Sequence, residues 1–136
     1  MFKAVWGFEN LKQILMSKNK NSKQYDLEER TLLFAKRVRA FVKKLPKTLA
    51  NVEDCRQLVK ASGSLGANYI EANEALSKKD FVMRIKISRK ESKESRFWLK
   101  LIDTDNNAEL ENERAELITE STELMNIFGA ILQKSK

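Results

Sequence analysis

Basic residues recur along one stretch of this sequence at a spacing that places them on a single helical face. This basic row consists of Arg89, Lys93, Arg96 and Lys100, with Lys86 and Lys90 flanking it. The offsets of four, seven and eleven residues form one continuous strip when the segment is helical. Such a strip can neutralise several phosphates and release their counterions, which favours binding to nucleic acid. Arg37 and Arg39 are secondary candidates for the same role.

The charge of the chain is segregated, and this leaves a second interpretation of the basic row open. The chain carries a net charge of +7, and residues 78–100 hold nine basic and three acidic side chains. Residues 107–134 hold two basic and six acidic side chains. The row is therefore either a phosphate-contacting surface or a solvated face that pairs with the acidic segment, within one subunit or across to another.

Polar and aromatic residues elsewhere admit both a functional and a structural interpretation. Paired carboxylates can perform acid–base chemistry, but with no nucleophile or metal ligands nearby a polar network between the second and third predicted helices is favoured. We expect this network to consist of Asn68, Glu71, Glu91 and Glu94, with Glu71 facing inward. Three aromatic residues could stack on bases, although aromatic residues at helical spacing usually belong to the core. They are Tyr69, Phe97 and Trp98.

The residue types needed by most catalytic sites are missing from this chain. It has no histidine and one cysteine, Cys55, so neither a Ser-His-Asp nor a Cys-His arrangement can form. A histidine-containing di-metal site of the kind found in four-helix bundles is excluded as well. No glycine-rich phosphate-binding loop is present. We therefore predict a protein that is not an enzyme and needs no cofactor or metal, with Cys55 in a structural role.

The elements that carry these residues are predicted to be helices throughout. The chain has four glycines and one proline, and its apolar residues recur at helical spacing. The sequence predicts an all-α, antiparallel, up-down-up-down four-helix bundle over residues 25–136. Residues 1–24 form a predicted leader, either a tail or a short helix followed by a polar linker. The predicted helices span residues 27–44, 52–76, 80–103 and 109–133.

Two local patterns refine this prediction. Asn51 is the predicted N-cap of the second helix, and Ser77 with Asp80 has the spacing of a capping box before the third. The apolar stripe of the third helix is interrupted by serines, which favours a close helix pairing with a small, polar seam. Its residues are Phe81, Ile85, Ser88, Ser92, Ser95, Leu99 and Ile102. We expect Ala61, Ser62 and Gly63 to supply the matching small surface.

The sequence holds no apolar run of the roughly 20 residues that a membrane-spanning helix needs. A single cysteine fits a reducing compartment. We therefore expect a cytoplasmic protein with no membrane partner.

Residues 26–103 resemble the four-helix-bundle family of proteins encoded in intervening sequences of 23S ribosomal RNA genes. The matching motifs are residues 27–31 (LEERT), 34–35 (FA), 57–58 (QL), 62–72 (SGSLGANYIEA), 74–75 (EA), 77–81 (SKKDF), 90–94 (KESKE) and 98–99 (WL). The resemblance implies an antiparallel bundle that associates as a homopentamer. It also extends to the basic accessory protein of diversity-generating retroelements, which implies a reverse transcriptase and nucleic acid as partners. The family brings no catalytic residues to carry over.

The hypothesis favoured by these observations is a non-enzymatic, oligomeric, basic scaffold that binds RNA or another nucleic acid through its phosphates. The alternative is a protein-interaction scaffold, a partner of a reverse transcriptase or of its own copies, with no intrinsic role in nucleic-acid binding.

Overall fold

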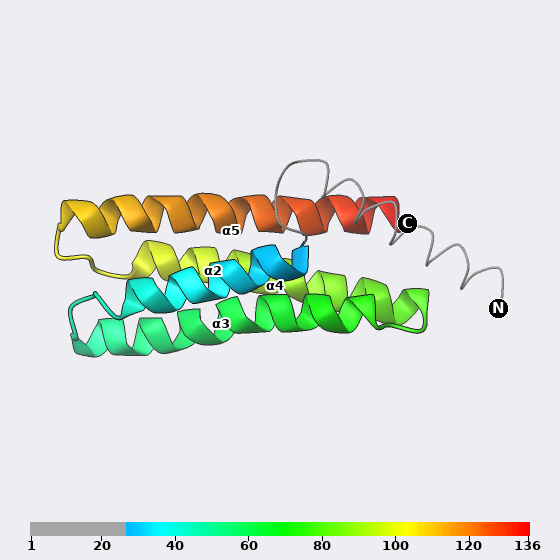
Figure 1. Cartoon of the computed structure of the whole chain (residues 1–136), viewed down its shortest axis with the longest axis horizontal. Helices are drawn as coiled ribbons and strands as arrows, with labels where there is room; N and C mark the ends of the chain where they lie inside the picture. The colour runs from blue at the N-terminus through cyan, green and yellow to red at the C-terminus, as the bar shows by residue number, and fades with distance from the viewer. Residues whose placement is uncertain (1–26) are drawn as a thin grey trace.

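The computed structural model describes residues 27–136, in which four helices and no strand occur. They are α2 (Leu27–Val42), α3 (Leu49–Asn73), α4 (Lys78–Leu101) and α5 (Ala108–Lys134) (Figure 1). The all-α prediction is confirmed, and every predicted helix lies within about three residues of its observed bounds. The predicted leader, residues 1–24, lies outside the described part of the chain.

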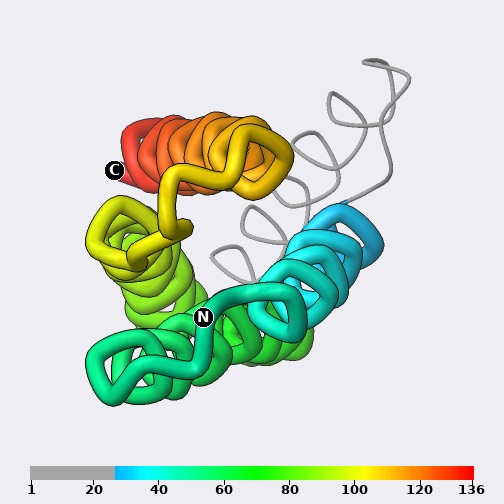
Figure 2. Tube along the Cα trace, turned by 90° about the vertical axis from the view of Figure 1, so that its left-hand side faces the viewer, coloured from blue at the N-terminus to red at the C-terminus, as the bar shows by residue number. Residues whose placement is uncertain are grey.

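The helices run alternately up and down and occupy the corners of a four-sided bundle. Figure 2 looks along the helices and shows them in the order α2, α3, α4, α5 around the bundle. Contacts join α2 with α3, α3 with α4, α4 with α5, and α5 back to α2. Short connections between consecutive helices impose this antiparallel order. The largest fully buried side chains include Phe34, Phe41, Phe81 and Phe128, one or two from each of three helices.

The helix starts show one correct and one wrong prediction. Ser77 caps α4, where its Oγ accepts a hydrogen bond from the backbone N–H of Asp80 at 3.1 Å. The N-cap of α3 is Thr48 and not Asn51, because Thr48 Oγ1 accepts from the N–H of Asn51 at 3.1 Å. The helix therefore begins three residues earlier than predicted. Asn51 therefore does not cap the helix, and its buried side chain is available for tertiary contacts.

The predicted serine seam on α4 is confirmed. Ser88, Ser92 and Ser95 are fully buried, and Ser88 Oγ donates to the carbonyl of Leu65 on α3 at 2.9 Å. Ser92 Oγ donates within its own helix to the carbonyl of Ser88, also at 2.9 Å. Small side chains at these positions let the two backbones approach closely. A hydroxyl that reaches a main-chain carbonyl also remains satisfied when it is buried.

The expected place of Gly63 in this seam is wrong. Ala61 and Ser62 are buried, but Gly63 and Gly66 are turned toward α2. A Cβ on Gly66 would lie 2.9 Å from Thr31 Oγ1 and 3.2 Å from Thr31 Cβ. The sequence predicts a close approach at these glycines but not which neighbour makes it. The neighbour depends on how α3 is rotated, and that rotation is set by the larger side chains around it.

We predict opposite outcomes for two alanine substitutions in α3. Gly66→Ala should destabilise the protein by about 1 kcal/mol, because overpacking against the buried Thr31 outweighs the gain in helix propensity. Gly63→Ala should be neutral or stabilise by up to about 1 kcal/mol. At that site the new methyl meets only the guanidinium end of Arg39, at 3.3 Å. Urea unfolding of the two variants measures the difference, and equal stabilities would contradict the assigned helix contact.

Candidate nucleic-acid interface

Helix α4 presents the basic row beside its buried stripe, on the flank that faces α5. Residues 81, 85, 88, 92, 95 and 99 are buried, so the positions between them point outward. Arg89, Lys93 and Lys100 of the row are exposed, as are the flanking residues Lys86 and Lys90. Arg96 is half-buried and its Nη1 donates to Thr122 Oγ1 of α5 at 3.4 Å. The structure thus brings all six predicted residues together along one helix.

Four of the six acidic side chains of α5 are directed toward α2. Arg30 binds Glu120 with two hydrogen bonds of 2.8 Å, Arg37 lies 3.4 Å from Glu116, and Lys44 lies 2.5 Å from Glu113. The pairing of Arg30 is largely shielded from solvent, and it raises the pKa of Arg30 mainly through the hydrogen bond to Glu120. These pairs form a ladder along the α2–α5 edge of the bundle.

The second interpretation of the basic row, as a partner of the acidic segment within one subunit, is therefore wrong. Within residues 27–136, no ion pair joins an acidic side chain to Lys86, Arg89, Lys93 or Lys100. The side of α5 that faces the row carries Thr122 and Gly129. The acids recur at three- and four-residue intervals on another face of α5, so the rotation of that helix separates them from α4. The row keeps an uncompensated positive charge at the surface.

Arg37 and Arg39 do not join the basic row. Arg37 pairs with Glu116 on the α2–α5 edge. Arg39 is exposed and its Nη1 donates to the carbonyl of Ala35 at 3.0 Å, beside Gly63 of α3. Since α2 contacts the two helices that flank α4, these arginines lie on other edges of the bundle. A ligand on the outer face of α4 would not reach them without extending around α5 or α3.

The predicted polar network forms only in part. Asn68 donates to the carbonyl of Ser64 at 2.9 Å and accepts from Arg84 Nη1 of α4 at 3.0 Å. The inward orientation expected for Glu71 is wrong, because Glu71 is exposed, and Glu94 is exposed too. The rotation of α3 about its own axis leaves residue 71 exposed. The α3–α4 contact instead uses Arg84, which the sequence analysis missed and whose four-residue spacing from Asp80 is its one visible signal.

Glu91 is the one network carboxylate that is mostly shielded, with 13% of its side chain exposed. Burial, and then repulsion from Glu94, raises its pKa. A raised carboxyl pKa lowers the free energy of unfolding as pH rises through that pKa, because the folded state disfavours the charged form. We predict that Glu91→Gln stabilises the protein at neutral pH and that its advantage disappears at about pH 4, below the ordinary glutamate pKa. Urea unfolding at both pH values tests this, and a pH-independent difference would contradict it.

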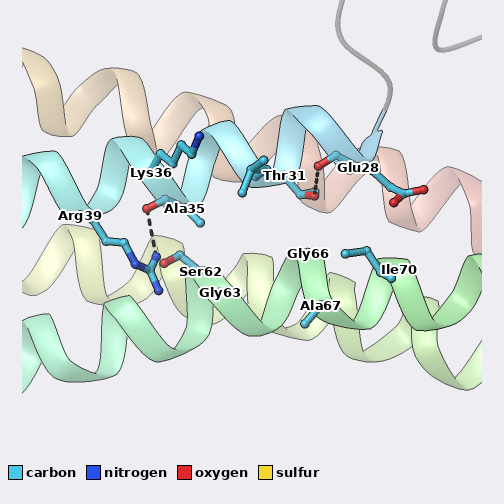
Figure 3. A pocket seen from close by; sticks show the side chains of 11 residues that line it. Glu28, Thr31, Ala35, Lys36, Arg39, Ser62, Gly63, Gly66, Ala67 and Ile70 are labelled. Carbon is cyan, nitrogen blue, oxygen red and sulfur yellow. Dashed lines mark hydrogen bonds between the residues drawn. The ribbon is translucent and has the colours of Figure 1, made fainter.

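An apolar groove of about 310 Å³ runs between α2 and α3 (Figure 3). Small residues form part of its lining, among them Ala35, Gly63, Gly66 and Ala67. Leu32 and Ile70 lie at its sides with 54% and 47% of their surface exposed. Nothing in this lining could act as a nucleophile with a neighbouring base, and the groove suits a packed partner better than a chemical reaction.

The described residues were also compared with three other kinds of site: a reactive cysteine, a metal site and a membrane-spanning helix. Cys55 is half-buried, and burial raises the pKa of its thiol, which favours the protonated form. No group of three His, Cys, Asp or Glu side chains in residues 27–136 is placed to hold a metal ion. None of the four described helices combines the length and apolar character needed to cross a bilayer.

Comparison with known proteins places this bundle among its relatives. The model of the family described as "23S rRNA-intervening sequence protein" matches residues 23–130. A crystal structure from Bacteroides thetaiotaomicron, described as a protein of unknown function from the S23 ribosomal protein family, is similar with a TM-score of 0.68 and 27% identity. The match covers 79% of this chain and 98% of that one. A search of curated proteins gave no match. Since the family model matches well over half of its residues, the chain belongs to the family of 23S rRNA-intervening sequence proteins.

Proposed function

We propose that this protein is a non-enzymatic, oligomeric bundle that binds RNA or another nucleic acid through the basic row of α4. The observation that carries the proposal is the absence of acidic partners for Lys86, Arg89, Lys93 and Lys100 within the described residues. Surface cations that no carboxylate neutralises attract an anionic ligand. A linear row of cations matches the phosphodiester backbone of a nucleic acid. The cytoplasm, where RNA is abundant, is the proposed compartment.

The shape of the row indicates how such binding would work. From Lys86 to Lys100 a helix rises about 21 Å, so the charges line a straight edge several nucleotides long. The exposed side chains are four lysines and one arginine, Arg89, and within residues 27–136 only Lys90 lies at ion-pair distance from a carboxylate, 3.8 Å from that of Glu91. Phosphate contacts of this kind fix position but carry no sequence information. Affinity should therefore depend strongly on salt and weakly on sequence.

Fluorescence anisotropy tests the proposal directly. The protein is titrated against a structured RNA and a random DNA at several salt concentrations. Binding with a log–log salt slope of about −3 or steeper would support contact with several phosphates. Absence of binding at low salt would refute the proposal, and the positive charge would then serve assembly or a protein partner.

A second candidate function is protein interaction, and the groove between α2 and α3 favours it. The proposed occupant is another copy of this chain, since the family resemblance implies homopentamers. A reverse transcriptase is the second partner that the resemblance implies. Leu32 and Ile70 leave apolar surface exposed in a groove that small residues also line, which suits helix packing.

Sedimentation analysis of a variant pair tests this interface. Ala67→Glu introduces a charge into the groove and should shift the protein to a smaller species. Ala130→Glu makes the same change on the exposed surface of α5 and should leave the mass unchanged. A monomeric wild-type protein would refute self-association through the groove, and equal masses for both variants would place the interface elsewhere.

A further inference from the structure

Phe97 is an exposed aromatic residue in the middle of the positively charged face of α4. Its exposed fraction is 57%, whereas the two other aromatic residues considered for base stacking, Tyr69 and Trp98, pack on the core. Tyr69 is buried and lies 5.8 Å from Phe128, ring centroid to ring centroid. Of the three, only Phe97 remains available to a ligand.

The ring of Phe97 is held in a defined position. It meets the ring of Trp98 in a T-shaped contact, with centroids 5.0 Å apart and planes at 81°. Trp98 in turn packs against the hydrophobic core, so Phe97 is supported by an anchored neighbour. A ring fixed in this way loses little conformational entropy when a ligand stacks on it.

The residues around Phe97 on the helix surface are mostly cationic and apolar, with one exposed acid, Glu94, three residues before it. Lys93 and Lys100 lie four residues before and three residues after it, so both are neighbours on the helix surface. Neither lysine pairs with a carboxylate in residues 27–136. Leu101, four residues after Phe97, is 53% exposed. The charges favour an anionic ligand, and the exposed ring and leucine favour one that also offers flat apolar surface.

We propose that Phe97 is a stacking platform for an unpaired base, so that the α4 surface prefers single-stranded to double-stranded nucleic acid. This inference rests on the proposed function and adds a substrate class to it. Bases within a duplex are stacked on each other and cannot lie on a side chain, whereas an unpaired base can. Proteins that bind single strands combine cationic tracks with aromatic rings, and the two lie within one helical turn here.

The expected effect follows from the known strength of base–aromatic stacking. Phe97→Ala should weaken binding of a single-stranded RNA of about 12 nucleotides by about tenfold. It should leave binding of the matching duplex within about twofold, because phosphate contacts remain. Phe97→Trp should retain the single-strand affinity. The salt slope should not change in either variant, because no charge is removed.

Leu101→Ala is the matched control, since it removes exposed apolar surface from the same face without removing a ring. It should bind both RNAs like the wild-type protein. Circular dichroism melting of all variants checks that the bundle is intact.

Each outcome of this experiment has a defined meaning. Equal loss of single-strand and duplex affinity in Phe97→Ala, or equal loss in Leu101→Ala, would overturn the stacking role while the proposed function stands. Loss of self-association in Phe97→Ala with unchanged RNA affinity would also overturn it and would assign the ring to a protein contact. If the wild-type protein binds neither RNA, the proposed function itself fails.

Discussion

Replacing Arg89, Lys93 and Lys100 together by glutamate should lower nucleic-acid affinity by at least about 100-fold at low salt. The substitution removes three of the cations that lack carboxylate partners and places three anions where phosphates would lie. Losing three phosphate contacts should also reduce the log–log salt slope by about 3. Arg96 is left unchanged because its hydrogen bond to Thr122 gives it a packing role that would confuse the result.

The matched control reverses the same number of charges outside helix α4. All three residues are exposed: Lys43 and Lys47 lie in the connection after α2, and Arg56 lies in the second turn of α3. Their triple glutamate variant has the same net charge as the α4 variant. If net charge alone governed binding, both variants would lose affinity equally, and the basic row would have no special role.

Enlarging the serine seam of α4 should cause the largest loss of stability. The double substitution Ser88→Leu and Ser92→Leu creates a continuous apolar heptad. The heptad pattern alone would predict that this stabilises the protein. Both positions are fully buried, and Ser88 Oγ lies 2.9 Å from the Leu65 carbonyl of α3. Two large side chains inserted at such a close contact must push α3 and α4 apart. We expect a destabilisation of roughly 2–6 kcal/mol, a large part of the stability of a domain this size.

Alanine at the same two positions separates overpacking from the loss of hydroxyls. Ser88→Ala with Ser92→Ala keeps the small volume and removes two hydrogen bonds, each of which contributes about 1 kcal/mol. Part of that loss is offset by the higher helix propensity of alanine. Urea unfolding should rank wild type first, the alanine variant second and the leucine variant last. A leucine variant more stable than the alanine variant would mean that the contact between α3 and α4 can accommodate larger side chains.

The sequence predicts the helices, the bundle and the composition of the α4 surface, because these follow from local periodicity. Ser77 caps its helix, the serines are buried, and the basic row lies on one face. Periodicity also shows that α5 carries acids on a common face. It does not determine which neighbour that face meets, and Glu116 and Glu120 pair with α2 because of how α5 is rotated in the bundle.

Periodicity does not determine how each helix is rotated in the bundle, and this also explains the wrong predictions for the polar residues. Glu71 and Gly63 were placed on the α4 side of α3, and the observed rotation directs one to solvent and the other to α2. The sequence does not predict the contacts of Arg84 with Asn68 or of Asn51 with Asp103, because these partners are distant in the sequence. A side-chain amide that binds the main chain of two separate loops leaves no periodic signal.

Asn51 gives the bundle a fixed longitudinal alignment. Its buried amide donates to the carbonyl of Pro46 at 3.0 Å and to that of Asp103 at 2.8 Å, and it accepts from the N–H of Asp103 at 3.0 Å. The two connections that these residues occupy lie at the same end of the molecule (Figure 1). If the α4–α5 hairpin slid past the α2–α3 hairpin by one helical turn, about 5.4 Å, a buried amide and a loop N–H would lose their partners. Apolar side chains tolerate such a slip far better than a buried amide does, so a single asparagine selects one alignment of the two hairpins over its neighbours.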